Sequence, residues 1–201
     1  MALPGTSSPA SGRIPAIRPA CPACGTSIET TSTHCPRCHF TGADTMKLFP
    51  GGAPPLLPVL DVASVWNAAG LRAIEAARSK VEKRFPQFRW HFVAVEMPAA
   101  TSLNLLGFWL LNASPLTPPE TANQRAWSVV VVINRTNGQA TVAPGYAAEP
   151  WVTPSAWQDA LAAMKPFWRI GESGKAAAAF LDAAARILER EWKNTGSPRT
   201  P

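Results

Sequence analysis

The stretch CPACGTSIETTSTHCPRCH contains all four cysteines of a chain of 201 residues. Cys21 and Cys24 form one Cys-x-x-Cys pair, and Cys35 and Cys38 form a second. The first pair alone has the spacing of a redox active site, and the second pair followed by His39 has the spacing of a c-type haem attachment. Together the two pairs have the spacing of a metal site. Of these three chemistries, only metal binding uses all four thiols.

A zinc site explains the spacing of the two pairs. Zinc takes four thiolate ligands in a tetrahedron, and each tight Cys-x-x-Cys turn aims two sulfurs at one point. Ten residues separate the two pairs, as in a compact zinc ribbon. Gly25 directly follows the first pair and suits a turn that needs a positive φ. We therefore predict a structural Zn²⁺ ion bound by Cys21, Cys24, Cys35 and Cys38.

The two other chemistries remain as alternatives with less support. A redox site needs a helix that starts at the motif, whereas Pro22 and Gly25 lead into a polar, β-branched stretch. A haem site needs export and a second axial ligand, and it leaves Cys21 and Cys24 unexplained.

Four cysteines already complete a tetrahedral shell. His34 and His39 flank the second pair, and we expect both to be bystanders rather than ligands. A catalytic zinc ion keeps one position for water, so a closed site is structural. The ribbon is expected to fold on metal binding and to present a surface for binding.

Composition divides the chain into segments. Its hydrophobic content of 46% indicates a real core, whereas its 21 prolines gather in 1–20, 50–58 and 115–119. We predict a disordered tail at 1–18, a zinc ribbon at 19–41, a linker at 42–57, an α/β domain at 58–194 and a disordered tail at 195–201.

Charge and hydropathy argue against two broad classes of protein. The formal charge of +6 is spread along the chain without a run of cations, so nucleic acid is not an expected partner. The most apolar stretch, LNLLGFWLLNA, is too short to cross a bilayer as a helix. The N-terminal residues lack the apolar core of a signal peptide. We expect a cytoplasmic protein, in which thiols stay reduced.

Periodicity predicts the elements of the larger domain. Apolar residues at helical spacing indicate a helix that Asn67 caps and Pro86 ends, and 89–96 reads as a strand in which His91 is packed or hydrogen-bonded. A buried helix at 103–111, two strands joined by a turn at Asn134–Gly138, and two helices opened by Thr153 and Ser173 follow. This order predicts an α/β/α sandwich with a small mixed sheet.

Two stretches resemble the TPM domain family in order and spacing. VLDVASVWNAAGLRAIEAARSKVEKRFPQFRWHFVAVEMP is similar to its opening, and SVVVVINRTNGQATVAPGYAAEPWVTPSAW is similar to its second half. Asp61 matches the family's early Asp, and Gly145, Tyr146 and Glu149 match its Gly-Tyr-Gly-Leu-Glu signature. Ala147 and Ala148 replace the inner Gly and Leu of that signature. The resemblance covers residues 58–190 and implies a TPM-like fold.

The family includes proteins of photosystem II repair, bacterial envelope proteins and a receptor-modulating membrane protein, and some members are described as weak acid phosphatases with divalent-metal sites. The resemblance leaves open whether this chain is an enzyme. We expect a non-enzymatic module that binds protein or assists assembly. The alternative is a weak divalent-metal-dependent acid phosphatase, in which Asp61 and Glu149 hold a second divalent cation near Tyr146.

Overall fold

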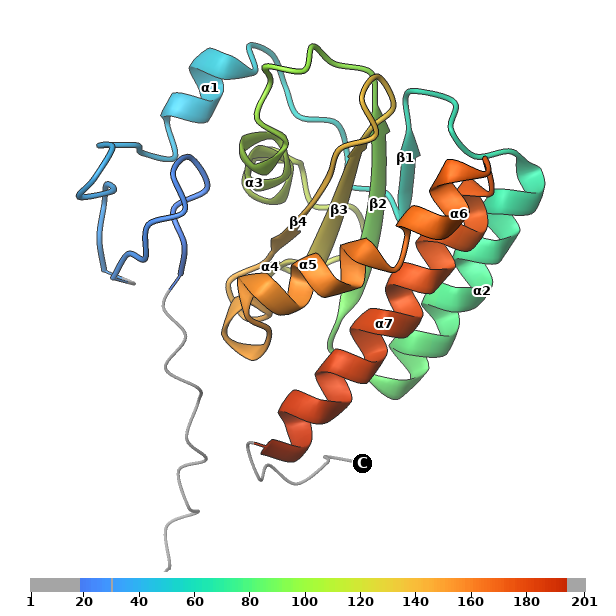
Figure 1. The fold of residues 1–201 in the computed structure, drawn as a ribbon. Coiled ribbons are helices and arrows are strands. Elements are labelled where there is room, and N and C mark those ends of the chain that lie inside the picture. Colours follow the sequence, from blue (N-terminus) through green and yellow to red (C-terminus); the bar gives the residue numbers. More distant parts are fainter. Residues whose placement is uncertain (1–18, 30, 195–201) are drawn as a thin grey trace, which may run out of the picture.

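A four-stranded mixed sheet forms the centre of the protein (Figure 1). The computed structural model describes residues 19–29 and 31–194, so the two predicted tails lie outside the described residues. The strands lie side by side in chain order, with β1, β2 and β3 parallel and β4 antiparallel to β3. Their bounds are β1 Val59–Asp61, β2 Arg89–Val95, β3 Ser128–Asn134 and β4 Ala140–Pro144.

Helices pack against both faces of the sheet (Figure 1). The helix α3 lies against β3 and β4 on one face, whereas α2, α5 and α7 pack together on the other. The bounds of the helices are α1 Asp44–Leu48, α2 Ala68–Arg84, α3 Leu103–Ala113, α4 Ala122–Ala126, α5 Pro154–Ala162, α6 Lys165–Arg169 and α7 Ser173–Asn194, with a 3₁₀ turn η1 at Glu149–Trp151.

The strand sequences divide the core into two layers. Because successive side chains of a strand point to opposite faces, Phe92 and Val131 lie in the cluster under α2, α5 and α7, whereas Val93 and Val130 lie in the cluster under α3. The strands β2 and β3 are apolar on both faces for this reason. The mixed α/β class predicted from the sequence is confirmed.

Local signals place several helix ends where the sequence predicts them. The Asn67 side chain accepts a hydrogen bond from the Gly70 amide at the start of α2, and the Thr153 hydroxyl accepts one from the Ala156 amide at the start of α5. The long last helix runs to Asn194 as expected. Ser173 is the first residue of this helix, and its hydroxyl donates to the carbonyl of Val65.

Three segments differ from the sequence prediction. The predicted single helix after Thr153 is divided into α5 and α6, and Pro166 is the second residue of α6, where its missing N–H costs nothing. The segment between α3 and β3, for which the sequence predicts no helix, contains α4, which a capping box between Thr121 and Gln124 opens. The predicted linker contains α1.

The segment after α1 packs against the apolar cluster that α3 forms with the sheet. The Phe49 ring lies 5.1 Å from the Trp109 ring, and Leu56 is buried in the same apolar cluster as the α3 side chains. Aromatic pairs at this distance are favourable beyond the apolar area that they bury. The chain between the cysteines and the sheet is therefore packed, and it does not act as a free spacer.

Among residues 19–29 and 31–194, no helix combines the length and the apolar character needed to span a membrane.

Candidate metal centre

The two Cys-x-x-Cys turns have the same backbone geometry. The Gly25 amide donates to the Cys21 carbonyl at 2.8 Å, and the His39 amide donates to the Cys35 carbonyl at 2.9 Å. The residue after each pair adopts a positive φ, 73° at Gly25 and 60° at His39. Glycine reaches this region without steric cost, and His is one of the few other residues enriched there.

A second hydrogen bond closes each turn. The Cys21 amide donates to the Thr26 carbonyl, and the Cys35 amide donates to the Phe40 carbonyl, both at 2.9 Å. The two turns are thus copies of one local structure. Such copies let two pairs of sulfurs face one another across a common centre.

The four sulfurs form one compact group. The Sγ atoms of Cys21 and Cys38 lie 3.7 Å apart, and those of Cys24 and Cys35 lie 3.6 Å apart. All four lie within 4.8 Å of one another. In a tetrahedral zinc–thiolate site with bonds of about 2.3 Å, the sulfurs are about 3.8 Å apart. Two of the sulfur distances therefore match that geometry, and the thiols are free rather than joined in disulfides.

The thiols influence one another's ionisation. Hydrogen bonds from the hydroxyl and the backbone of Thr26 hold the pKa of Cys24 down at about 6. At Cys38 a hydrogen bond from the Phe40 backbone lowers the pKa. Burial and the three other thiols raise it by more, so the pKa of Cys38 is about 12. Four thiolates at this distance repel one another, so they cannot all be negative without a cation between them.

This donor set therefore fits a metal ion. Four cysteine sulfurs converge on one point, backbone amides of the turns donate toward them, and the group contains neither His34 nor His39. The rings of those histidines lie 6.2 Å apart on the exposed side of the second turn. The four predicted cysteine ligands are brought together by the structure.

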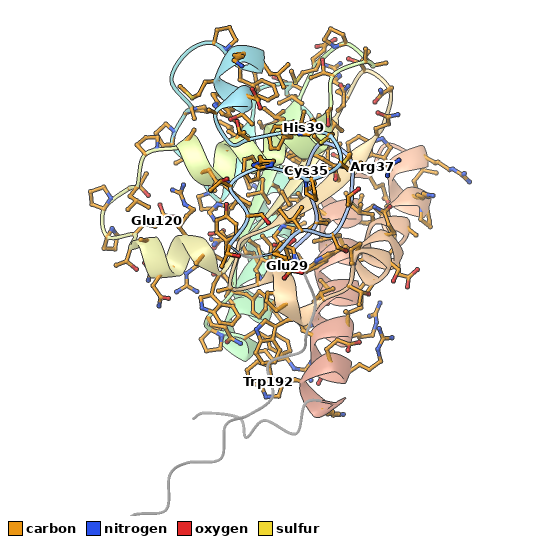
Figure 2. All side chains as sticks on the ribbon, turned by 90° about the vertical axis from the view of Figure 1, so that its left-hand side faces the viewer. Glu29, Cys35, Arg37, His39, Glu120 and Trp192 are labelled. Atoms are coloured by element: carbon orange, nitrogen blue, oxygen red, sulfur yellow. The ribbon has the colours of Figure 1, made fainter. Side chains whose placement is uncertain are left out.

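The cysteine segment is attached to the α/β domain by contacts that the sequence does not reveal. The Ala20 amide donates to the Glu149 carboxylate at 3.0 Å, and the Phe40 ring meets the Phe108 ring of α3 edge to face at 5.9 Å. Figure 2 shows this segment, with Cys35 labelled, on the side of the molecule that faces the viewer. The pKa of Glu149 is raised above its ordinary value, because burial raises it more than the hydrogen bond from Ala20 lowers it.

The two carboxylates expected to share a second cation lie apart. Asp61 ends β1 at one edge of the sheet, and its two oxygens accept the amides of Val65 and Trp66, both at 2.9 Å. Glu149 follows the far end of β4, at the other edge. Three strand spacings alone separate them by about 14 Å. The turn before β4 is visible in the sequence, but the strand order that places β1 and β4 at opposite edges is not.

The other signature residues have local structural contacts. An added Cβ at Gly145 would lie 2.5 Å from the Ala126 carbonyl oxygen, so only glycine fits at this crossing. Tyr146 is 64% exposed, and its hydroxyl donates to Asn112 Oδ1 at 3.3 Å. Neither residue contacts Asp61 in the described structure.

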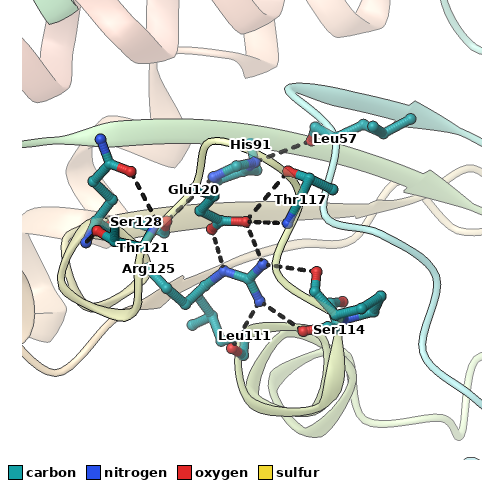
Figure 3. Close-up of polar contacts among 11 residues, drawn as sticks. Leu57, His91, Leu111, Ser114, Thr117, Glu120, Thr121, Arg125 and Ser128 are labelled. Atoms are coloured by element: carbon teal, nitrogen blue, oxygen red, sulfur yellow. Dashed lines mark hydrogen bonds and ion pairs between the residues drawn. The ribbon is translucent and has the colours of Figure 1, made fainter.

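A second group of polar side chains is buried between α4 and the sheet (Figure 3). The guanidinium of Arg125 pairs with Glu120 and donates to the carbonyls of Leu111 and Ser114 at the end of α3. Nearby, the ring of His91 bonds the Leu57 carbonyl at 3.0 Å and the Ser128 hydroxyl at 3.2 Å. These contacts satisfy buried groups and hold α3 and α4 on the strand ends. The prediction that His91 is packed or hydrogen-bonded is confirmed.

Comparison with known proteins supports the fold alone. No family model matches the chain, and no curated protein matches it. The chain is similar to the solved N-terminal domain of a protein from P. gingivalis, with 13% identity, a TM-score of 0.50, and coverage of 77% of this chain and 94% of that domain. It is also similar to the N-terminal domain of the cg2496 protein from Corynebacterium glutamicum, with 14% identity, a TM-score of 0.50, and coverage of 71% and 84%. At such low identity the α/β architecture is shared, and nothing about activity follows.

Proposed function

We propose that this chain is a non-enzymatic protein-binding or assembly module, in which a structural zinc ion holds a ribbon against a TPM-like α/β domain. The observation that carries this proposal is the set of four sulfurs within 4.8 Å of one another. Zinc would be held by Cys21, Cys24, Cys35 and Cys38, and a shell of four protein ligands leaves no position for a reacting water. The role of such a site is to fold a surface.

The attachment of the ribbon supports a single composite surface. The contacts from Ala20 to Glu149 and from Phe40 to Phe108 join the ribbon to η1, which follows β4, and to α3. A partner that touches both parts would therefore depend on zinc for the arrangement of its binding surface. The four-stranded sheet with helices on both faces is compatible with the TPM resemblance, as is the fold shared with the two solved domains.

The phosphatase alternative has no support from the described residues. Phosphoryl transfer needs a cation or a cationic clamp at the transferred group. The carboxylates of Asp61 and Glu149 lie at opposite edges of the sheet. An assay of phosphate release by the wild-type chain and by Asp61→Ala tests this alternative directly.

The module function is tested by partner recovery. The intact tagged protein, a variant with all four cysteines changed to serine, and a control variant with His34→Ser and His39→Ser are used as bait. Proteins recovered by wild type and by the histidine variant, but not by the cysteine variant, are then purified and mixed with the chain. The proposal predicts a complex that forms with wild type and is lost after zinc chelation.

Two outcomes would contradict the proposal. One is a set of recovered proteins that is identical for all three baits. The other is phosphate release that disappears in Asp61→Ala while no recovered protein forms a complex with the purified chain.

A further inference from the structure

The outer strand β4 borders a cavity of about 860 Å³. The loop before α3 forms one wall, the turn between β3 and β4 forms another, and α5 and α6 form the third. Ala140 and Thr141, at the start of β4, line its floor. No described residue of the ribbon lines the cavity, because the ribbon is attached near Glu149, at the far end of β4. This end of the sheet edge is therefore left open.

The start of β4 offers backbone groups for another strand. The Asn134 amide bonds the Gln139 carbonyl, and the Gly145 amide bonds the Ser128 carbonyl, so these pairs fix which β4 residues point toward β3. Along β4, residues that bond β3 alternate with residues that do not. Ala140 and Val142 belong to the second set, so their N–H and C=O groups point away from β3. No hydrogen bond to these outward groups occurs in the described part of the chain.

The β4 edge also lacks the features that normally block strand addition. Charged side chains and prolines protect sheet edges in natural proteins. The sequence of β4 is ATVAP, with no charge and with its single proline at the end far from the cavity. An extended segment can therefore pair with Ala140 without meeting either obstacle.

The lining of the cavity favours apolar and acidic side chains in such a segment. Leu161, Met164 and Trp168 supply an apolar wall, and the size of the cavity is in the range of protein ligand pockets. Lys165 and Arg169 line the same cavity, one helical turn apart and exposed. Neither has an ion-pair partner among the described residues, and no acidic side chain lines the cavity.

The charge of the cavity argues against occupation by residues 1–18 or 195–201. Residues 1–18 contain Arg13 and Arg18 and no acidic residue, and residues 195–201 contain Arg199 and no acidic residue. Cationic segments are repelled by Lys165 and Arg169. The unpaired cations favour an occupant with negative charge, which neither of these two segments supplies.

We propose that the β4 groove binds an extended acidic peptide segment of a partner protein as a fifth strand. The backbone of the segment pairs with Ala140 and Val142, an apolar side chain enters the space beside Trp168, and carboxylates face Lys165 and Arg169. This inference rests on the proposed binding function and names the class of partner.

A defined peptide tests the groove. The probe is a fluorescein-labelled heptapeptide of alternating glutamate and valine, titrated with the full zinc-loaded chain and followed by fluorescence anisotropy. We expect saturable binding with a Kd in the micromolar range. The double variant Lys165→Glu, Arg169→Glu should weaken binding by about tenfold or more, because attraction becomes repulsion. The matched control Arg72→Glu, Lys83→Glu makes the same charge change on α2 and should bind as wild type.

Strand pairing has its own readout. The amide of Ala140 should exchange with solvent more slowly when the peptide is bound, and a peptide with N-methyl groups along one edge should fail to bind. Equal binding of the N-methylated peptide would overturn strand addition. Tighter binding of a single-stranded DNA oligonucleotide of equal charge would overturn the peptide assignment, and the absence of peptide binding up to about 1 mM would overturn the groove proposal as a whole.

The two proposals fail in distinguishable ways. If a purified cellular partner binds wild type and the Lys165→Glu, Arg169→Glu variant equally, the module function stands and the groove proposal fails. If the acidic peptide binds as expected but no cellular protein forms a zinc-dependent complex, the groove stands and the module function fails.

Discussion

The hydrogen bonds of His91 depend on residues that are distant in the sequence. The sequence places it in a strand, and the local pattern is enough to predict that it packs against neighbours rather than binding metal. Its actual partners are Leu57 and Ser128, which are 34 and 37 residues away in the chain. Local patterns cannot identify partners at such separations. The pairing of the cysteines was predictable, because the spacing alone brings the two members of each pair together.

The burial of His91 makes stability depend on pH. Desolvation lowers its pKa from 6.5 to about 4, so the folded state favours the neutral ring. Its contribution is complete above pH 6.5 and is lost as the pH falls toward 4, because only the unfolded chain takes up the proton in this range. We expect the free energy of unfolding to fall by roughly 3 kcal/mol between these pH values from this group. Urea unfolding across the range measures the fall, and NMR titration of the His91 ring should give a midpoint near 4. A midpoint near 6.5 would contradict this assignment.

The helices α2 and α7 cross at two glycines. On α2 and α7, Gly70 and Gly174 lie in contact, and a Cβ added at Gly174 would collide with the backbone of Gly70. The contact between these two helices is the most extensive helix–helix contact in the described structure. The periodicity of each helix is visible in the sequence, but the crossing point depends on how the two helices are placed together.

Replacement of Gly174 by alanine tests this crossing. Alanine is the better helix former by about 1 kcal/mol, yet we expect Gly174→Ala to destabilise the protein by roughly 1–3 kcal/mol, because the two helix backbones must separate. Gly42→Ala is a matched control, since an added Cβ there meets nothing within 4 Å. Thermal and urea unfolding of both variants measure the difference. Equal stability of the two variants would show that α2 and α7 do not cross at these glycines.

At the scale of the whole molecule, a short cysteine segment packs against a larger α/β domain. The hydrogen bond from Ala20 to Glu149 joins residues 129 positions apart, so no local pattern could predict it. The same limit explains the separation of Asp61 and Glu149, whose positions depend on strand order and direction. The strands β2, β3 and β4 and the long helices were predictable, because their signals lie within a few residues of each other, whereas the three-residue β1 and the short helices α1 and α4 were not.

Removal of the Glu149 carboxylate should loosen the attachment of the ribbon. In Glu149→Ala the Ala20 amide loses its acceptor, so we expect faster hydrogen exchange at Ala20 and faster proteolysis between the ribbon and α1. In Glu149→Gln the amide oxygen still accepts, and both rates should stay close to wild type. Zinc content should be equal in all three proteins. Unchanged exchange at Ala20 in Glu149→Ala would show that the carboxylate does not hold the ribbon.

The metal content of the protein tests the central claim most directly. Native mass spectrometry of the chain purified under reducing conditions should give one zinc ion per molecule, and all four cysteines should resist alkylation until zinc is chelated. A folded protein that carries no metal and reacts with iodoacetamide at Cys21, Cys24, Cys35 and Cys38 would contradict it.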